Sequence, residues 1–426
     1  MNRIVWLGLT GIALVGCKLS AAPPATDLDG DKTWSGVIGP LVLQRCATCH
    51  RAGDIGPFPL ETYEQVLAMQ PAVLAAVREG RMPPFPPEQS DESGCPKIED
   101  VRLMTAEERV TLVDWLEGGA PQGEPKEFPP AKAYQPLGPP SDTFKMVTAY
   151  ESKSQTEDDY RCFIIDPVLL TSYPVAAISA LPGNRSVVHH ASVYLVPAGS
   201  LGAVQKLDDE EEGPGYTCFG GAGVANAIPA GVWVPGNDAP LVPTHTGLGY
   251  YLPVGWTFVL QVHYNFAAGR APDQSSIVAW KTQSPLITEI PRALVAGNMD
   301  FLIPPGAMDY SVEGESHFVA MGEANDHITS AVEGKVYAVW GHQHLKGRSF
   351  QMELVRPDGS TQCLLRIPRW NFAWQSIYRL KDPIAAKPGD RLKVKCTFDN
   401  PGDSPVRYGE DTNDEMCFGS VALINP

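Results

Sequence analysis

The spacing of hydrophobic positions divides the chain into a short helical part and a long part made of strands. Between residues 33 and 120, apolar residues recur at helical spacing over Tyr63–Glu79 and again after Thr105, where Thr105 and Glu108 form a capping-box pattern. Beyond residue 142, short runs rich in Val, Tyr, Phe and Thr alternate with Gly and Pro turns. These runs predict strands at Ser186–Leu195, Thr257–Phe266, Lys335–Gly341, Gln362–Ile367 and Arg391–Phe398.

This pattern predicts a mainly β protein, with two tandem antiparallel β-sandwiches preceded by a small all-α domain. The 426 residues suit about three domains. A proline-rich stretch between the helical and strand parts is expected to be a semi-rigid linker. The expected divisions are a signal peptide at 1–17, a polar tether at 18–32, the helical domain at 33–120, the linker at 121–142 and sandwiches at 143–285 and 286–426.

Composition and charge exclude several classes of protein. With 43% hydrophobic and 19% charged residues, the chain is globular rather than disordered or collagen-like. A net charge of −16 repels phosphate backbones, so no nucleic-acid partner is expected. The nine cysteines are an odd number, so disulfides alone do not account for all of them.

The first seventeen residues predict export. A charged start precedes an apolar run of about 13 residues, Ile4–Gly16, which suits a signal peptide and is too short for an ordinary membrane span. Leu14–Cys17 resembles the lipobox of bacterial lipoproteins, which implies that Cys17 is lipidated and begins the mature chain. The alternative is an ordinary secretory signal with a chance cysteine. We expect a lipid-anchored protein on the periplasmic side, and Lys18, where an aspartate would signal inner-membrane retention, favours the outer membrane.

A C-x-x-C-H motif at Cys46–His50 predicts covalent attachment of one haem c. Cys46 and Cys49, on one helical turn, reach the two vinyl groups of the haem, and His50 supplies an axial nitrogen. The alternatives are a redox C-x-x-C pair and half of a zinc site. A zinc ribbon needs a second C-x-x-C and a thioredoxin-like site needs a βαβ pattern, and the sequence has neither.

The second axial ligand of the haem is expected to be Met82, which follows a predicted helix and precedes two prolines. The alternative is that Met82 packs in the core and that Met69 or Met104 binds the iron. The segment from Cys46 to Pro84 resembles the cytochrome modules fused to bacterial copper monooxygenases. The all-α domain is therefore expected to be a cytochrome c-like domain.

Histidines gather in the predicted strands. His342 and His344 are two residues apart, so both side chains lie on one face of a strand and can bind one metal ion. Adjacent His189 and His190 point to opposite faces of a regular strand, so sharing an ion requires a bulge or the other ring nitrogen. Imidazole pairs with a soft third ligand suit copper. The histidines expected in loops or on the surface are His245, His317 and His327.

Four motifs then occur in a fixed order: Val187-Val188-His189-His190, Leu260-Gln261-Val262-His263-Tyr264, Gly341-His342-Gln343-His344 and Asp414-Glu415-Met416-Cys417. Over residues 143–426 they resemble the peptidylglycine α-hydroxylating monooxygenase and dopamine β-monooxygenase family. The resemblance implies two similar jelly-roll-like sandwiches and two copper ions facing each other across a gap. It assigns His189, His190 and His263 to an electron-transfer copper, and His342, His344 and Met416 to an oxygen-activating copper.

The same resemblance implies two disulfides, Cys162–Cys218 in the first sandwich and Cys396–Cys417 in the second. It gives no guide to Cys95 and Cys363, because the family's hormone-pathway enzymes lack the fused cytochrome. These two cysteines either pair, which would clamp the haem domain onto the second sandwich, or are free thiols. Pairing requires Cα atoms within about 7 Å of each other.

Departures from the family concern the substrate. Trp340 stands where the peptide-amidating member has an arginine that binds the substrate carboxylate, so peptides ending in glycine are not expected substrates. Tyr160 matches a pocket residue of the family. Trp340, Phe418, Trp370 and Trp374 form either an aromatic pocket for an apolar substrate or parts of the sandwich cores.

Together these features predict a copper type II monooxygenase that hydroxylates a C–H bond of a small or apolar substrate with O₂. The reaction needs two electrons, which the haem would pass on from a periplasmic donor. The alternative is a non-catalytic lipoprotein that transfers electrons or holds copper. The complete set of six copper ligands argues against it, because a copper carrier does not need two dissimilar sites.

Overall fold

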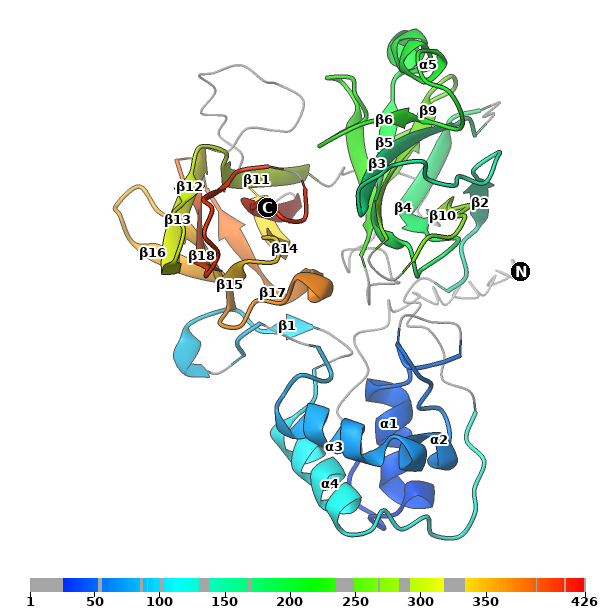
Figure 1. Ribbon diagram of the computed structural model, residues 1–426, viewed down its shortest axis with the longest axis vertical. Helices are drawn as coiled ribbons and strands as arrows, with labels where there is room; N and C mark the ends of the chain where they lie inside the picture. The colour runs from blue at the N-terminus through cyan, green and yellow to red at the C-terminus, as the bar shows by residue number, and fades with distance from the viewer. Residues whose placement is uncertain are drawn as a thin grey trace, which may run out of the picture.

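The protein consists of a helical part and two larger β parts (Figure 1). The computed structural model describes residues 26–52, 56–84, 87–89, 91–99, 103–129, 138–167, 171–234, 249–266, 269–282, 292–317, 334–387, 389–409 and 411–424. We name residues 26–129 the N-terminal module, 138–282 the first β unit and 292–424 the second β unit. Neighbouring strands within the described sheets run antiparallel, so the mainly β, antiparallel class predicted from the sequence is confirmed.

Short helices surround an apolar core in the N-terminal module. Capping boxes begin two of them, because Thr62 and Gln65, and likewise Thr105 and Glu108, satisfy each other's backbone N–H groups. The core holds fully buried side chains such as Leu112. The helical elements are η1 (Trp34–Ile38), α1 (Gly39–Arg45), α2 (Tyr63–Ala68), α3 (Gln70–Arg78), η2 (Asp91–Ser93) and α4 (Ala106–Glu117).

The helical spacing over Tyr63–Glu79 is confirmed, and the structure divides this stretch between two helices. Pro71 lacks an N–H group, and its ring would clash with the carbonyl four residues earlier in a continuous helix. Helix α2 therefore ends at Ala68, and α3 begins at Gln70 with Pro71 in its first turn, where no intrahelical N–H is needed.

Two sheets of the first β unit enclose one apolar core. One sheet has the strand order β2-β10-β4-β8 and the other β6-β3-β9-β5-β7. Side chains from both sheets meet in the core, among them Ile178, Val193, Phe258 and Ile277. The elements are β2 (Asp142–Lys145), β3 (Asp158–Ile165), β4 (Tyr173–Leu181), β5 (Val188–Val196), η3 (Ala198–Ser200), α5 (Leu201–Asp209), β6 (Tyr216–Thr217), β7 (Ile228–Trp233), β8 (Tyr250–Leu252), β9 (Thr257–Asn265) and β10 (Ser276–Lys281).

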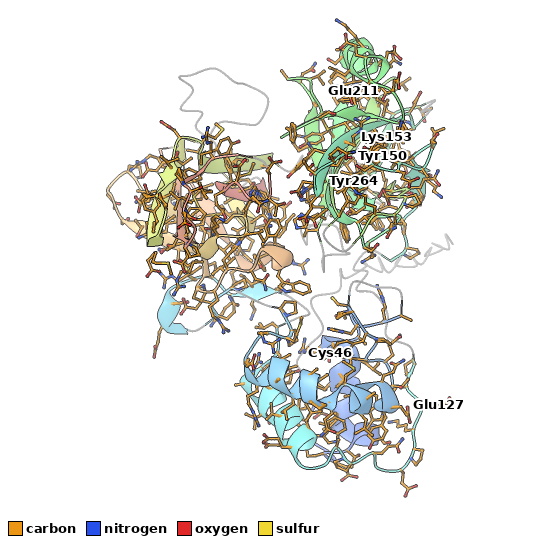
Figure 2. All side chains as sticks on the ribbon, viewed as in Figure 1. Cys46, Glu127, Tyr150, Lys153, Glu211 and Tyr264 are labelled. Atoms are coloured by element: carbon orange, nitrogen blue, oxygen red, sulfur yellow. A yellow bond between two sulfur atoms is a disulfide. The ribbon has the colours of Figure 1, made fainter. Side chains whose placement is uncertain are left out.

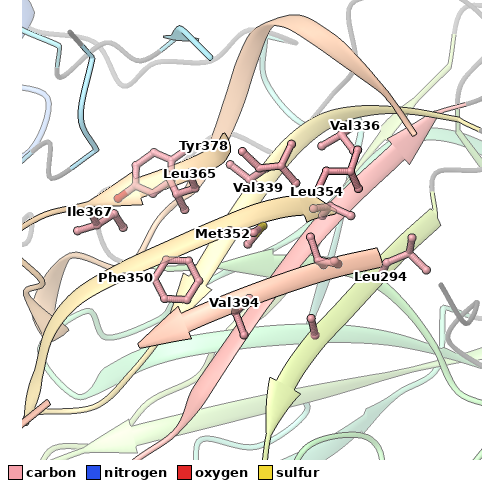
Figure 3. Close-up of a cluster of buried hydrophobic side chains, with 14 of the residues drawn as sticks. Leu294, Val336, Val339, Phe350, Met352, Leu354, Leu365, Ile367, Tyr378 and Val394 are labelled. Carbon is pink, nitrogen blue, oxygen red and sulfur yellow. The ribbon is translucent and has the colours of Figure 1, made fainter. Parts of the chain in front are cut away.

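The second β unit also has two main sheets around its own core, in which Val339, Phe350, Met352 and Val394 meet (Figure 3). Their strand orders are β1-β17-β14-β20-β11 and β13-β18-β15-β16, with a small β12-β19 pair beside them. The elements are β11 (Arg292–Asn298), β12 (Leu302–Ile303), β13 (Ala307–His317), β14 (Gly334–His342), β15 (Gly347–Val355), β16 (Thr361–Ile367), η4 (Phe372–Trp374), β17 (Ile377–Ala386), β18 (Arg391–Asn400), β19 (Val406–Arg407) and β20 (Cys417–Ile424).

The N-terminal module is attached to the second β unit. Its strand β1 (Ile98–Glu99) pairs with β17 (Figure 1), and a disulfide joins Cys95 to Cys363 with a Cα–Cα distance of 4.8 Å. Of the two possibilities left open by the sequence, the structure has the paired cysteines. The other disulfides are Cys162–Cys218 and Cys396–Cys417, the two pairs that the family resemblance implied.

Some features predicted from the sequence lie outside the described residues. They are the signal peptide with Cys17, the start of the tether, residues 130–137 of the linker, His245 and His327. His317 is the last residue of β13. Within the described residues, no helix has the length and apolar character that crossing a membrane requires.

Gly314, in β13, marks a point where the two sheets of the second β unit approach each other closely. A Cβ atom at this position would lie 2.4 Å from backbone atoms of Gly297 in β11. We expect Gly314→Ala to lower the free energy of unfolding by about 1–3 kcal/mol, because backbone cannot yield as a flexible side chain does. Urea unfolding measures the change. Gly199→Ala is the control, since a Cβ there meets open space, and equal stability of the two variants would contradict the prediction.

Candidate metal centres

Three histidines of the first β unit converge on one point. The ligand nitrogens of His189, His190 and His263 all lie within 4.8 Å of one another. The register of β5 on β9 shifts between Val188 and His190, so of the two possibilities left open for the adjacent histidines the structure has the bulge. His190 lies opposite His263 in the ladder, and the extra residue lets His189 join them.

The ring of His263 is held with one nitrogen turned toward this point. Its Nε2–H donates to Asp158 Oδ1 at 2.9 Å, and Tyr160 stacks on it with ring centroids 4.0 Å apart. The other ring nitrogen, Nδ1, is buried and has no partner among the described residues. The Nδ1 atoms of His189 and His190 are 3.2 Å apart. Three nitrogen lone pairs that face each other in a buried place fit a bound cation.

Asp158 also joins the two β units. Its Oδ2 accepts a hydrogen bond from the backbone N–H of Thr412, in the second unit, at 3.2 Å. Burial alone would raise the pKa of Asp158, but the hydrogen bonds from His263, Thr412 and Asn265 outweigh it and hold the pKa well below the usual range. The carboxylate is therefore charged and orients His263 as an acidic partner of a metal ligand does.

A second group of candidate ligands lies where β14 ends. His342 and His344 have ring centroids 5.0 Å apart. His342 pairs with Phe418 of β20, two residues after Met416, and both His342 and Met416 line one cavity. The structure therefore brings the thioether of Met416 to the end of the strand that carries both imidazoles.

The Nδ1 atoms of this second pair are already bonded, which leaves Nε2 as the ligand atom on each ring. His342 Nδ1–H donates to Gln375 Oε1, and His344 Nδ1–H donates to the Asp414 carbonyl at 3.1 Å. The buried Glu415 carboxylate accepts from the backbone N–H groups of His344 and Lys346 at 2.8 and 2.5 Å. These contacts fix the orientation of both rings without occupying the nitrogens that would bind metal.

Burial keeps four of the candidate ligands neutral, namely His189, His190, His342 and His344. Loss of solvation lowers the pKa of His189 and of His342 to about 3, with a further contribution from neighbouring histidines. The pKa values of His190 and His344 are lowered for the same main reason. A neutral imidazole has a free lone pair, so these rings can bind metal without first losing a proton.

Both groups open onto one cavity of about 530 Å³ between the β units. His189 and His190 lie on one wall, and His342 and Met416 on the other. Most of the remaining lining is apolar or aromatic and comes from strands of both units, including Tyr160, Ile178, Val232, Val295, Val339, Trp340, Phe372, Phe418 and Ala422. Such a lining suits an apolar ligand with few polar contacts.

The aromatic residues named from the sequence divide between cavity and core. Tyr160, Trp340 and Phe418 line the cavity, and Trp340 also stacks on His342 with ring centroids 5.3 Å apart. Trp370 instead packs against the hydrophobic core of the second unit. Trp374 is not among the lining residues.

The C-x-x-C-H motif lies at the end of α1 in the N-terminal module. Cys46 and Cys49 are not in disulfides, and the chain between residues 56 and 60 folds back on His50. His50 Nδ1 bonds to the Phe58 carbonyl at 2.9 Å, which leaves Nε2 available. A side chain at Gly56 would lie 2.8 Å from that ring. Two cysteines outside any disulfide and an oriented imidazole are the groups that attachment of haem c requires.

The three methionines considered for the iron occupy different positions in the module. Met104 is buried in the module core and Met69 packs against that core. Met82 follows α3 outside this cluster and is half-buried. Arg109 Nη1 donates to the Met82 carbonyl at 3.5 Å and so connects this loop to α4.

Residues 294–422 match the family described as "Copper type II ascorbate-dependent monooxygenase, C-terminal domain". The second β unit resembles copper type II monooxygenases. His342, His344 and Met416 all lie within the matched residues. The similarity to copper type II monooxygenases implies copper, and the cluster of His189, His190 and His263 is compatible with it.

Relatives of the chain extend the similarity into the first β unit. Human "Putative DBH-like monooxygenase protein 2" is 26% identical over 243 residues, 55% of this chain and 46% of that protein. Human "DBH-like monooxygenase protein 1" is 25% identical over 258 residues, 57% of this chain and 40% of that protein. The chain therefore spans less than half the length of these relatives. Among solved structures, the alignment with PNGF-II covers 66% of this chain and 65% of the PNGF-II chain. The two are 9% identical in sequence, with a TM-score of 0.25.

Sequence reasoning missed the residues that support the candidate ligands. Asp158, Phe372 and Gln375 lie outside the four motifs, and no local pattern connects them to a histidine. Only Asp158 has a signal in the sequence, and it is weak: Asp158 begins a strand that pairs with the strand carrying His263. Glu415 lies inside a quoted motif, but its role as acceptor for three backbone N–H groups depends on the folded loop.

Gln375→Ala is expected to weaken copper binding at His342 and His344 by roughly 10–100-fold, the usual effect of removing a residue that orients a metal ligand. Without the Gln375 acceptor, His342 is free to rotate and to take the other tautomer. Competition with a chelator measures the affinity. Gln351→Ala is the control, because Gln351 bonds to Glu353 on β15. Unchanged copper affinity of the Gln375 variant would show that the bond does not orient the ligand.

Proposed function

We propose that the protein is a copper-dependent monooxygenase that hydroxylates a C–H bond with O₂. His189, His190 and His263 would hold one copper ion, and His342, His344 and Met416 a second. The observation that carries this proposal is the single cavity onto which both groups open. When bound, the copper ions would supply oxygen activation and electron transfer. Three imidazoles suit both oxidation states of copper, whereas two imidazoles and a thioether favour Cu(I), the state that binds O₂.

The chain's own residues would organise the reaction. Asp158 and Gln375 hold His263 and His342 in one ring orientation. The mostly apolar walls offer water few hydrogen-bond partners, which would limit the loss of reactive species to solvent. The hydrogen bond from Thr412 to Asp158 keeps the two walls together.

The substrate is proposed to be a small apolar molecule. Trp340 and Phe418 offer flat apolar surfaces beside His342. Trp340 also replaces the arginine that binds a carboxylate in the peptide-amidating relatives. A peptide ending in glycine would therefore lack its counter-charge here.

The remaining parts of the proposal follow from the sequence. Cys46, Cys49, His50 and Met82 would hold a haem c that supplies electrons from a periplasmic donor, so the N-terminal module would be a cytochrome c-like domain. The two β units would be the tandem jelly-roll-like sandwiches of the family, because each encloses its own core between two sheets. The chain would be exported and anchored through a lipid on Cys17.

Metal analysis and isotope labelling test the proposal. We expect two copper ions and one haem per chain, and incorporation of one ¹⁸O atom from ¹⁸O₂ into a metabolite from a screen of apolar compounds. Copper-depleted protein is the control and should give no labelled product, with recovery when copper returns. Fewer than two copper ions, or oxygen uptake that no screened compound stimulates, would favour the alternative of a copper-holding protein.

A further inference from the structure

The segment that crosses from β16 to β17, residues 368–376, connects the two main sheets of the second β unit. We name it the crossover segment. The N-terminal module is bonded to both strands that flank the crossover segment, β16 and β17. On β16, the module is bonded to Cys363 through the Cys95–Cys363 disulfide. It is also bonded to Arg366, whose carbonyl accepts a hydrogen bond from the Glu88 N–H at 2.8 Å. On β17 it pairs β1 and forms the Glu99–Arg379 ion pair at 3.0 Å.

The first residues of the crossover segment touch the module directly. A Cβ atom on Gly80 would lie 3.3 Å from Arg369 Nη2. Arg109, on α4, donates from Nη1 to the Met82 carbonyl at 3.5 Å. Gly80 is two residues before Met82, the proposed haem ligand. The segment therefore begins beside the loop of that ligand, and Cys46 also lies on the side of the module that faces the β units (Figure 2).

The middle of the crossover segment reaches both histidine groups. The ring of Phe372 stacks on His189 with centroids 4.7 Å apart, and meets His344 edge-on at 5.7 Å. Three residues further, Gln375 accepts the hydrogen bond from His342. One short segment thus contacts a candidate ligand of the first β unit and two of the second. From Arg369 to Phe372 the backbone spans at most about 11 Å, since an extended residue covers no more than roughly 3.6 Å.

We propose that the crossover segment is the path by which the N-terminal module reduces both copper ions, with Phe372 as the branch point. This inference rests on the proposed function. Each electron that leaves the haem converts Fe(II) to Fe(III) and one Cu(II) to Cu(I). Two such transfers, refilled by a one-electron donor, supply the two electrons that one hydroxylation needs. Phe372 contacts ligands and is not itself oxidised or reduced; it is a positioning residue.

The direct test uses the full chain loaded with haem and Cu(II). After anaerobic mixing with a substoichiometric one-electron donor, absorbance reports reoxidation of the haem, and freeze-quench EPR reports loss of Cu(II). We expect Phe372→Leu to slow haem reoxidation about tenfold, which corresponds to roughly 1.4 kcal/mol in the barrier. Trp374→Leu is the matched control, because Trp374 is an aromatic residue of the same segment with no ring contact to a described histidine. Equal rates in the Phe372 variant and wild type would overturn the proposal.

A second variant decides the question if Phe372→Leu does not fold. Replacing Cys95 and Cys363 by alanine, together with Glu99→Ala, removes the disulfide to β16 and the ion pair to β17, leaves the backbone hydrogen bonds to both strands, and touches no copper ligand. We expect slower haem reoxidation but unchanged reduction of Cu(II) by added ascorbate. Reoxidation as fast as in wild type would overturn the proposal. Failure of wild type to bind copper would instead refute the proposed function, and copper binding with slow haem reoxidation would refute this inference alone.

Discussion

Replacing His342 by alanine is expected to abolish oxygen incorporation while leaving the fold intact. His342 lies on the cavity wall, is held by Gln375 and has only Nε2 free for metal. Removal of a residue that merely supports a ligand costs up to about 100-fold in activity, so loss of the ligand itself should cost more. Labelled product from ¹⁸O₂ measures activity. EPR of bound Cu(II) should show that the copper at His189, His190 and His263 remains.

His317→Ala provides the matched control for this result. His317 belongs to the same β unit, is the last residue of β13 and is not a candidate copper ligand. This variant should form product at the wild-type rate. If His342→Ala kept more than about one hundredth of the wild-type rate, the Gln375-bound imidazole would not be a ligand of the reactive copper.

Replacing Glu108 by glutamine is expected to unfold or strongly loosen the N-terminal module. Glu108 is fully buried, and its Oε1 accepts from Arg45 Nη2 at 2.9 Å and from the Thr26 N–H at 2.8 Å. Its Oε2 accepts from the Thr105 N–H at 2.8 Å and so completes the cap of α4. Breaking a buried ion pair leaves an uncompensated charge and costs about 3–5 kcal/mol. That is a large part of the roughly 5–15 kcal/mol that stabilises a domain.

The same carboxylate gives the module an acid-dependent stability. Burial raises the pKa of Glu108, but hydrogen bonds from Arg45, Thr26 and Thr105 outweigh it and lower the pKa below the ordinary value of 4.5. The folded module therefore binds the proton less tightly than the unfolded chain. The contribution is complete above the ordinary pKa and is lost as the pH falls through the folded value. The glutamine variant should lack this part of the pH dependence.

Hydrogen exchange of the α4 amides in the full chain, followed from pH 7 downward, measures both effects. A double variant, Arg45→Met with Glu108→Leu, separates charge from packing, because an apolar pair of similar volume is often as stable as a buried ion pair. We expect the double variant to recover most of the lost protection. Wild-type protection in Glu108→Gln would contradict the assignment of this pair as a main support of the module.

Strands and capping boxes were predictable because local patterns determine them. All five strands predicted from alternating and β-branched runs are present, with ends within two residues of those expected. The Thr105–Glu108 box is formed. The break at Pro71 is also a local signal, because proline cannot continue a helix. Side-chain alternation alone predicted that His189 and His190 need either a bulge or the other ring nitrogen, and the bulge is present.

What the sequence could not supply is the contact between distant segments. Asp158 meets His263 across 105 positions and Thr412 across 254. The sequence around Phe372 indicates only a loop rich in aromatic residues, yet Phe372 contacts histidines of both β units. The Cys95–Cys363 pair could not be decided for the same reason, since 268 positions separate its members. Such pairings depend on how the units pack, which single-segment patterns do not encode.

The two residues of β1 have a consequence for the solubility of any shortened form. They occupy the outer side of β17, which is otherwise the last strand of its sheet. A strand at the border of a sheet exposes unpaired N–H and C=O groups that attract strands of other chains. A protein cut down to the two β units would carry that bare border, and with it a tendency to associate with itself. The N-terminal module therefore also protects the second β unit from aggregation.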